Sequence, residues 1–596
     1  MAAPASPDYI IIGGGTSGLV VASRLAEDPN VQVLVLEAGK DLSADPRVNV
    51  PAFFTTLMGS DADWKYKSVA QQGLKGRTIG APQGKALGGS SAINGQAFIA
   101  PSQAELDAWA QLGNPGWDWA GLVPFFRKFY TLIPPPDKET RDHLGIDWIN
   151  EDFRGTSGPI KVSFPGVLQN PLAKAWIDAF RTLNSTTTGD PFSGNSLGAY
   201  SNAATVDPES KIRSYAGNAF DIQQKPNVRI VTEAQVLKIL FTGAASDAVK
   251  ATGVQVLVDG KSQEFKAGKE IILAAGVFNT PKLLECSGVG GKNILKQHGI
   301  PVVVDLPGVG ENLQDHLMTG LSYEVIDGVV TGDPLLRQEP EAMGAAQKLY
   351  FEHKAGPFTM GGMQSHAFMP TQDAVEVLKT AVGKPHRPEE QEQFDIIRGI
   401  LEKPDATSGA WLMFLAQANL HEGGSSFVGS KFHPENFASL GCIQSHPFSR
   451  GCSHITSSDP NVPPTIDPRY FSHPADLEIF ARHVRDLDTR LRPTEPLAKY
   501  FKPDGKRNHP DAFNVQDLEG AKKYTLDTAT SAYHQCGTAA MLPREKGGVV
   551  NSHLIVYGTE NLRIVDASIF PLIPRGNIMS SVYAVAEKAA DIIRGH

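Results

Sequence analysis

Residues 8–28 read DYIIIGGGTSGLVVASRLAED, and this stretch decides the fold of the chain. The four apolar residues Tyr9 to Ile12 predict a strand, and the apolar spacing from Leu19 to Ala26 predicts a helix. The turn between them has the pattern G-x-G-x-x-G and consists of Gly13, Gly14, Gly15, Thr16, Ser17 and Gly18. In this pattern the first glycine permits the turn, the second lets backbone N–H groups approach a pyrophosphate, and the third lets helix and strand pack closely. Alone, the pattern also fits a purely structural turn.

A second apolar run, Val31 to Leu36, ends in Glu37. An acidic residue about 20 residues beyond the glycine turn is typical of a site that holds the ribose hydroxyls of an adenine nucleotide. We therefore expect Glu37 to accept hydrogen bonds from a ribose. The alternative is a glutamate that faces solvent at the end of a strand.

The composition excludes several classes of protein. The 596 residues are 41% hydrophobic and 20% charged, which is ordinary for a soluble globular protein, and no apolar run reaches the ~20 residues of a membrane helix. The net charge of −9 comes without a basic cluster, so we expect neither nucleic acid nor membrane as a partner. The four cysteines lack the paired C-x-x-C spacing of a zinc site, and we expect no metal.

The first seven residues, MAAPASP, have neither the basic nor the apolar region of a secretory signal. An intracellular location is therefore expected, although a chain trimmed of its leader would look the same. The single glycosylation sequon at Asn184 does little to favour secretion.

A second glycine-rich run, Gly88-Gly89-Ser90-Ser91, can begin a helix with exposed N–H groups and hydroxyls. Such a loop can hold the other side of the same pyrophosphate. The alternative, a flexible linker, is disfavoured by the flanking apolar residues Leu87, Ile93 and Phe98.

Several further elements follow from the apolar patterns. We expect helices at Trp109–Tyr130, Leu168–Leu183, from Asp476 and at Ile578–Ile593, and strands at Val228–Val231 and Gln235–Phe241. Asp259-Gly260 predicts a hairpin between Gly253–Val258 and a strand returning to Leu273. A third glycine turn then precedes a helix with Thr280 as N-cap and Pro281 as first helical residue. We also expect strands after Gly356 and at Trp411–Phe414, and we expect them to fill a sheet core and not to line a substrate cavity. The charged segment Lys379–Glu402 is expected to be a solvated helix or an insertion.

The runs Gly88–Gly95, Gly276–Gly290, Leu306–His316, Ser449–Gly451, Ile466–Tyr470, His534–Thr538 and Leu562–Ser568 occur in this order along the chain. Together they resemble the glucose-methanol-choline (GMC) flavoprotein oxidoreductases over nearly the whole length. Val277 departs from the small residue that is usual at its position.

The resemblance implies an α/β fold in which a Rossmann-like FAD-binding domain is interleaved with an α+β substrate-binding domain built on an antiparallel sheet. The expected FAD-binding segments are 7–155, 225–315 and 545–596, and the expected substrate-binding segments are 156–224 and 316–544.

The resemblance also implies the site residues. His534 matches the catalytic histidine in an H-x-x-G-T setting, with Gln535 where proline is common, and Asn577 matches its His or Asn partner. His316 is expected to pack against the flavin domain. FAD is expected to bind without a covalent link, because Ile93 stands where some relatives tether the flavin through histidine. The implied FAD contacts are Gly13, Gly15, Thr16, Ser17, Gly18, Glu37, Ala38, Trp64, Gly88, Gly89, Ser90, Asn94, Val236, Asp566, Ala567 and Asn577.

Two classes of function stay open. The first is an oxidase or dehydrogenase that acts on the CH–OH group of a small or aromatic alcohol, with His534 as base, Asn577 as orienter, and oxygen or quinone as electron acceptor. The second is a non-redox or light-driven enzyme on the same fold. A formate- or aldehyde-oxidising branch is a further alternative, which requires Arg575 to replace the arginine that this branch has in place of Asn577.

Overall fold

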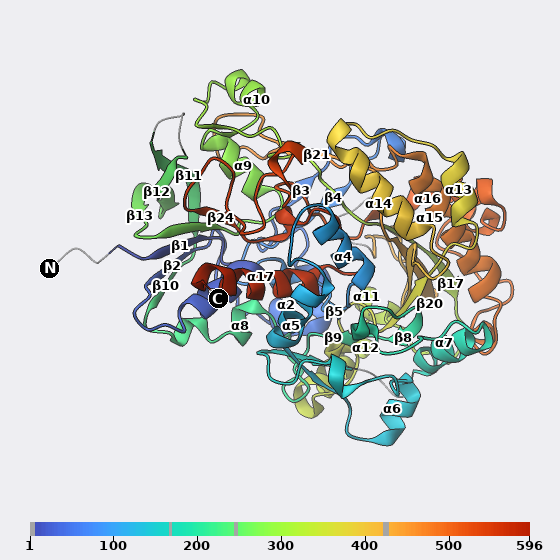
Figure 1. Cartoon of the computed structure of the whole chain (residues 1–596). Helices are drawn as coiled ribbons and strands as arrows, with labels where there is room; N and C mark the ends of the chain where they lie inside the picture. Colours follow the sequence, from blue (N-terminus) through green and yellow to red (C-terminus); the bar gives the residue numbers. More distant parts are fainter. Residues whose placement is uncertain (1–5, 166–169, 244–247, 421–427, 596) are drawn as a thin grey trace.

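The computed structural model describes residues 6–165, 170–243, 248–420 and 428–595. The apolar run at the N-terminus forms the centre of a five-stranded parallel sheet (Figure 1). Its strand order is β10 (Val228–Val231), β2 (Val33–Leu36), β1 (Tyr9–Ile12), β14 (Glu270–Leu273) and β24 (Leu562–Ile564). The sheet therefore combines segments from both ends and the middle of the chain.

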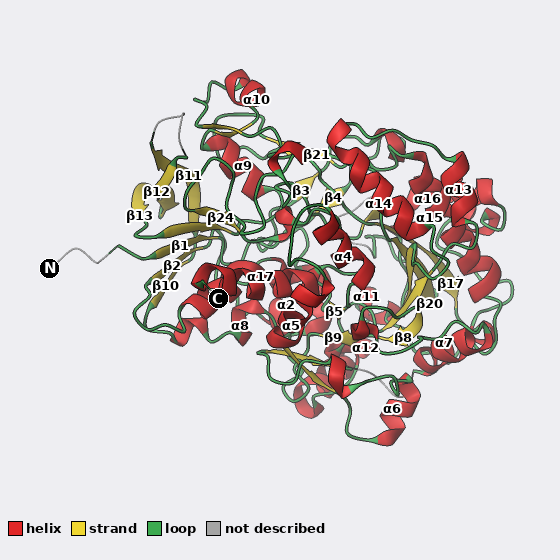
Figure 2. Ribbon diagram, in the orientation of Figure 1, coloured by secondary structure: helices red, strands yellow, loops and turns green. Residues whose placement is uncertain are grey.

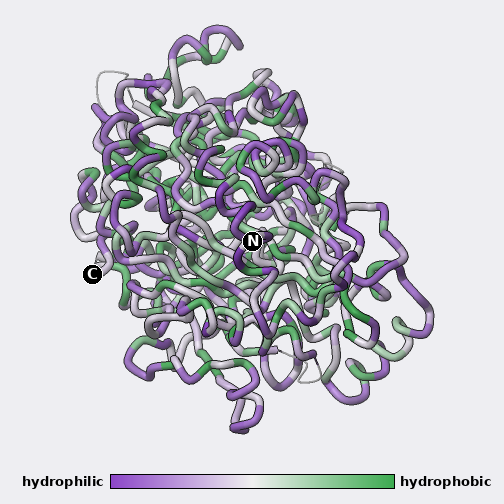
Figure 3. Tube along the Cα trace, turned by 90° about the vertical axis from the view of Figure 1, so that its right-hand side faces the viewer, coloured by the Kyte–Doolittle hydropathy of each residue, from purple (hydrophilic) through white to green (hydrophobic). Residues whose placement is uncertain are grey.

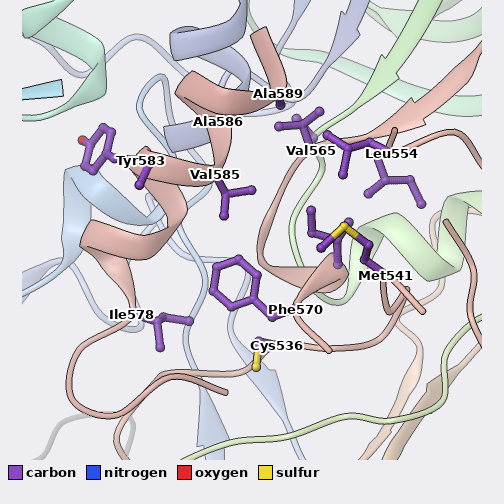
Figure 4. Close-up of a cluster of buried hydrophobic side chains, with 14 of the residues drawn as sticks. Cys536, Met541, Leu554, Val565, Phe570, Ile578, Tyr583, Val585, Ala586 and Ala589 are labelled. Atoms are coloured by element: carbon purple, nitrogen blue, oxygen red, sulfur yellow. The ribbon is translucent and has the colours of Figure 1, made fainter. Parts of the chain in front are cut away.

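Three helices pack together beside this sheet. Helix α17 (Met579–Arg594) contacts both α1 (Thr16–Leu25) and α5 (Trp119–Phe129). Figure 4 shows that side chains of α17 such as Tyr583 and Val585 form one buried cluster with Phe570 and Met541. The C-terminal helix thus packs on α1, which begins in the N-terminal glycine turn, and on Phe570, which follows β24.

The predicted hairpin is confirmed. It consists of β12 (Lys250–Val258) and β13 (Lys261–Lys266), and β11 (Ala234–Thr242) pairs with β12 to complete a three-stranded sheet. Asp259 and Gly260 both have positive φ, as a type I′ turn requires. The expectation of one strand returning to Leu273 is wrong. The chain leaves the hairpin after Lys266 and enters the parallel sheet separately as β14.

The second large sheet is antiparallel and has six strands (Figures 1 and 2). Its order is β23 (Thr530–Ser531), β17 (Leu317–Glu324), β20 (Phe437–Gln444), β19 (Gly409–Phe414), β18 (Ser365–Met369) and β8 (Gly198–Ser201). Since successive side chains of a strand point to opposite faces, Trp411 joins one hydrophobic cluster while Leu412 joins another. The cluster of Trp411 includes residues of α7 (Pro171–Thr182), α15 (Pro474–Asp486) and α16 (Leu518–Thr528).

A smaller sheet and short two-stranded pairs complete the architecture. The smaller sheet has the order β5 (Ala97–Phe98), β9 (Ala203–Ala204), β7 (Ile160–Ser163) and β6 (Tyr130–Ile133). The pairs are β3 (Tyr66–Lys67) with β4 (Gly80–Ala81), β15 (Val289–Gly290) with β16 (Val304–Asp305), and β21 (Cys452–His454) with β22 (Thr465–Asp467). The remaining α-helices are α2 (Pro46–Asn49), α3 (Ser90–Ile93), α4 (Gln103–Gln111), α6 (Lys138–Leu144), α8 (Ala216–Ala219), α9 (Asn279–Cys286), α10 (Lys292–Gln297), α11 (Asp333–Leu336), α12 (Pro340–His353), α13 (Ala374–Thr380) and α14 (Gln391–Leu401).

The single helix expected at Trp109–Tyr130 is wrong, because α4 ends at Gln111 and α5 begins at Trp119. Between them Gly113 and Gly116 have positive φ, and the Asp118 carboxylate accepts the Gly121 N–H at 2.8 Å as the N-cap of α5. The helices expected from Asp476 and at Ile578–Ile593 are confirmed as α15 and α17. The helix expected from Leu168 is confirmed as α7 from Pro171 onward; Leu168 lies outside the described residues.

Hydrophobic and hydrophilic residues alternate over short distances along the chain (Figure 3). In the described part of the chain, no helix is both long and apolar enough to cross a membrane.

Candidate active site

A cavity of about 330 Å³ is lined by residues of both large sheets. One part of its wall comes from the first turn of α1, the ends of β1 and β2, and the start of α9. Another part comes from Met318 on β17, Leu412 on β19 and Ile443 on β20. A cavity outside the carboxyl ends of parallel strands is where α/β sheets bind nucleotides.

Two glycine turns meet at this cavity. A Cβ atom on Gly18 would lie 2.0 Å from the Gly13 carbonyl oxygen, so only glycine lets α1 pack this closely on β1. Gly89 has a φ of +54°, and a Cβ there would lie 2.8 Å from the Gly15 Cα. The backbones of the two turns therefore face each other closely, as a cradle for a pyrophosphate requires.

Glu37 ends β2 and is buried, with 6% of its surface exposed. Its carboxylate accepts the N–H groups of Gly14 at 2.8 Å and Gly39 at 2.7 Å. Burial raises the pKa of Glu37 to about 7, although both backbone bonds oppose the shift. The alternative of a solvent-facing glutamate is therefore wrong. A buried acceptor in the cavity wall fits the hydroxyl groups of a ribose.

Asp566 connects β24 to the start of α9. Its carboxylate accepts the Gly276 N–H at 3.0 Å, the Thr280 hydroxyl at 2.7 Å and the Ser568 N–H at 2.8 Å. The expected N-cap role of Thr280 is wrong, because α9 begins one residue earlier at Asn279 with Phe278 as N-cap. The Thr280 hydroxyl bonds to Asp566 instead of capping its own helix.

Most of the residues implied by the sequence line this cavity: Gly13, Gly15, Thr16, Ser17, Glu37, Ala38, Trp64, Gly89, Ser90, Asn94, Val236, Asp566, Ala567, His534 and Asn577. Gly18 and Gly88 are not in the wall. A Cβ on Gly88 would lie 2.4 Å from a ring carbon of Tyr215, so this glycine allows close packing behind the loop.

His534 and Asn577 approach each other from two separate loops. The Asn577 Nδ2 atom lies 2.9 Å from the His534 Nε2 atom, and both residues line the cavity. On its other side, the His534 Nδ1 atom lies 3.1 Å from the Nδ1 atom of His316. Burial lowers the pKa of His534 to about 3 and that of His316 well below its ordinary value, so both rings are neutral at pH 7.

The loop of His534 is held by Asp315. The Asp315 carboxylate accepts the His534 backbone N–H at 3.0 Å, and it also accepts the hydroxyls of Ser531 at 2.6 Å and Tyr470 at 2.5 Å. Sequence reasoning missed Asp315 and gave His316 only a packing role. Both belong to the Gln314-Asp315-His316 run of the family motif, which was the available signal.

The part of the wall contributed by the antiparallel sheet is apolar. Met318, Leu412 and Ile443 lie there, so the core-only interpretation of Trp411–Phe414 is wrong for Leu412 and right for Trp411. The charged residues among the described lining residues are Glu37, Lys282 and Asp566, which come from the parallel sheet and α9.

Arg575 is buried behind this wall. Its guanidinium lies 3.8 Å from the Phe368 ring centroid and donates to the Ser196 carbonyl at 3.1 Å, and it is not among the described lining residues. In the described ranges, no group of three or more His, Cys, Asp or Glu side chains is arranged to hold a metal ion.

The double glycine cradle with a buried acid at the end of β2 is the arrangement of a dinucleotide-binding protein. Family models described as GMC oxidoreductase match residues 7–318 and 447–586. The chain belongs to the GMC oxidoreductase family, whose cofactor is FAD, and the predicted fold class is confirmed.

Several proteins match over nearly the whole chain. "Dehydrogenase mpl7" of Monascus purpureus is 31% identical, over 98% of this chain and 96% of its own. An FAD-dependent oxidoreductase from Chaetomium thermophilum, in complex with a fragment that carries pyridine and thiophene rings, is 30% identical with a TM-score of 0.86, over 99% of both chains. A formate oxidase variant from Aspergillus oryzae is 28% identical with a TM-score of 0.85, over 99% of this chain and 98% of that chain.

Proposed function

We propose that this enzyme oxidises the CH–OH group of a small or aromatic alcohol whose remaining part is apolar and uncharged. The observation that carries this proposal is the His534–Asn577 pair in the wall of a cavity to which the antiparallel sheet contributes Met318, Leu412 and Ile443. A charged substrate would leave its charge buried against these side chains without a partner.

His534 is the base of this reaction. A hydride leaves a carbon readily only as the attached hydroxyl loses its proton, so a neutral imidazole nitrogen is needed beside that hydroxyl. His534 is neutral because of its burial, and its Nε2 atom accepts a hydrogen bond from Asn577. Bound FAD supplies the hydride acceptor. The Asn577 amide donates to the substrate oxygen and stabilises its developing negative charge.

The cofactor is bound by the residues that line the cavity, with Glu37 on the ribose and the Gly15 and Gly89 turns on the pyrophosphate. Gly18 and Gly88 shape these turns. Binding is non-covalent, since Ile93 offers no nucleophile. The chain is organised as FAD-binding segments 7–155, 225–315 and 545–596, interleaved with substrate-binding segments 156–224 and 316–544.

Formate is disfavoured as the substrate. Its oxidation here would require Arg575 to contact the anion, whereas the Arg575 guanidinium stacks on Phe368 behind the wall. An aromatic alcohol is favoured by the apolar lining, and the aromatic fragment in the Chaetomium relative agrees with this preference. The electron acceptor is oxygen or a quinone.

The test is anaerobic mixing of the FAD-loaded enzyme with a panel of alcohols, aldehydes and formate while the oxidised-flavin absorbance is recorded. Loss of absorbance with an apolar alcohol is the expected result. Loss with formate alone, or product formation without any loss, would refute the proposal. Air is then admitted, and formation of hydrogen peroxide distinguishes an oxidase from a dehydrogenase that needs a quinone.

A further inference from the structure

Behind the candidate base lies a second histidine that the proposed chemistry does not yet use. The rings of His316 and His534 are perpendicular, with an interplanar angle of 89°, and their Nδ1 atoms are 3.1 Å apart. His316 is completely buried and His534 is 6% exposed. The two side chains come from positions 218 residues apart, so the fold brings them together.

The hydrogen-bond partners of these rings favour one arrangement of their protons. Two neutral imidazoles that meet through Nδ1 can share only one proton, so one Nδ1 must donate and the other must accept. Asn577 Nδ2 donates to His534 Nε2 at 2.9 Å, which leaves that nitrogen without a proton. His534 therefore carries its proton on Nδ1 and donates it to His316.

The surroundings make His316 a suitable acceptor. The ring is completely buried, and the Gly576 backbone beside it favours a proton on the ring. Gly576 lies between Arg575, whose N–H donates to Glu105 at 3.1 Å, and Asn577. Three consecutive loop residues, Arg575 to Asn577, therefore contact the buried carboxylate of Glu105, the His316 ring and the candidate base His534.

Among the described residues, no carboxylate takes this position. The ring partners of His534 within the described ranges are Asn577 and His316, whereas the Asp315 carboxylate bonds to the His534 backbone and to the hydroxyls of Ser531 and Tyr470. In catalytic triads, an acid holds the tautomer of the histidine base and stabilises its charged form. Here a neutral imidazole is in the corresponding place.

We propose that His316 is a positioning residue for the base: it accepts a hydrogen bond from the His534 Nδ1–H and keeps Nε2 unprotonated, so that a substrate hydroxyl can take the place of the Asn577 hydrogen bond there. It also stabilises the imidazolium that forms when Nε2 takes the hydroxyl proton. This inference rests on the proposed function. In the step, the substrate O–H bond breaks and its proton binds His534 Nε2, while bound FAD would accept the hydride from the adjoining carbon. The Nδ1 proton stays on His534, and its bond to His316 becomes charge-assisted and stronger.

The test compares His316→Asn with His316→Leu in the FAD-loaded enzyme. Asparagine can place an oxygen close to the position of Nδ1 and keep the acceptor, whereas leucine removes it at similar volume. We expect His316→Leu to slow anaerobic flavin reduction about 10- to 100-fold and to shift the acid limb of the pH profile of reduction to lower pH, because loss of the acceptor lowers the pKa of His534, with FAD content unchanged. His316→Asn should keep most of the rate. The control is His483→Leu, which removes another buried histidine whose ring contacts Thr371, Ser408 and Trp411 and does not contact His534 among the described contacts.

The proposal would be overturned if His316→Asn and His316→Leu slowed flavin reduction equally. A wild-type rate and pH profile in His316→Leu would also overturn it. A second measurement does not depend on turnover or on the folding of a variant. The ¹⁵N NMR spectrum of histidine-labelled, FAD-loaded wild type should show His534 protonated on Nδ1 and bare on Nε2, and the reverse tautomer would refute the inference. If no alcohol bleaches the flavin, the proposed function fails, while the NMR result still decides the tautomer.

Discussion

The Nδ2 atom of Asn577 lies 2.9 Å from the Nε2 atom of His534, so the proposed donor and the proposed base meet at one point of the cavity wall. A substrate hydroxyl at this point would receive the amide hydrogen bond on its oxygen and give its proton to the imidazole. The pair is arranged for an oxygen that becomes negative, which is the chemical requirement of hydride removal.

We first predict the effect of removing each member of this pair. His534→Ala should slow anaerobic flavin reduction by an apolar alcohol by about 10²- to 10⁴-fold, because it removes the general base. Asn577→Ala should slow it by about 10²- to 10³-fold at most, because it removes one donor to a developing oxyanion. Stopped-flow absorbance measures both rates, and the ratio of flavin to protein absorbance checks that FAD is retained. A wild-type rate in fully loaded His534→Ala would assign the base elsewhere.

The second prediction concerns Glu37. Glu37→Gln should weaken FAD binding about 10-fold or more, because the amide oxygen can accept only one of the backbone N–H groups of Gly14 and Gly39, and the amide NH₂ then faces the other as donor against donor. Titration of the apoprotein with FAD, followed by flavin fluorescence, gives the affinity. The matched control is Glu233→Gln, which alters an exposed glutamate just beyond β10. Equal affinity for Glu37→Gln and the control would exclude a role for Glu37 in the nucleotide site.

The third prediction is that FAD is released without breaking a covalent bond. Ile93 ends α3 and lines the cavity at the position where some relatives attach the flavin, and its side chain cannot form such a bond. Acid precipitation of the holoenzyme should leave all yellow colour in the supernatant. A fluorescent protein band on a denaturing gel would contradict this expectation.

Local signals explain which elements could be predicted from the sequence. The turn from Gly13 to Gly18 joins a strand to a helix within a few residues, so its geometry depends on the residues themselves, and β1 and α1 are where the pattern predicts them. The prediction of one helix at Trp109–Tyr130 is wrong because apolar residues such as Trp117 and Leu122 continue the helical spacing across the break between α4 and α5. Asn114-Pro115-Gly116 and the cap at Asp118 mark that break, and they outweigh the periodicity.

The tertiary contacts of the site could not be predicted in the same way. His316 and His534 belong to motifs separated by more than 200 residues, and no local pattern indicates that their rings meet. The same holds for Thr280, which the sequence assigns to a helix N-cap and the fold assigns to Asp566. A resemblance to a family supplies such residues as a set, whereas their distances require the packed structure.

The last prediction follows from histidines that are buried in their neutral form. Burial lowers the pKa of His366 to about 3 and that of His483 to about 4, from about 6.5 in an unfolded chain. Below pH 6.5 the unfolded state therefore binds protons that the folded state does not. The stability contributed by each neutral histidine is complete above pH 6.5 and is lost as the pH falls toward the folded pKa, by about 1.4 kcal/mol per pH unit.

His366 gives the clearest test of this linkage. His483 accepts a hydrogen bond from the Trp411 indole at 3.0 Å, so its removal would also break a contact, whereas neither ring nitrogen of His366 has a hydrogen-bond partner among the described residues. His366→Leu should therefore narrow the difference in thermal midpoint between pH 8 and pH 5, with the gain concentrated at pH 5. Differential scanning fluorimetry across this range measures it, and His353→Gln, at an exposed histidine, controls for the loss of one imidazole. If His366→Leu lowered the thermal midpoint equally at pH 8 and pH 5, His366 would contribute to packing and would not cause the acid sensitivity.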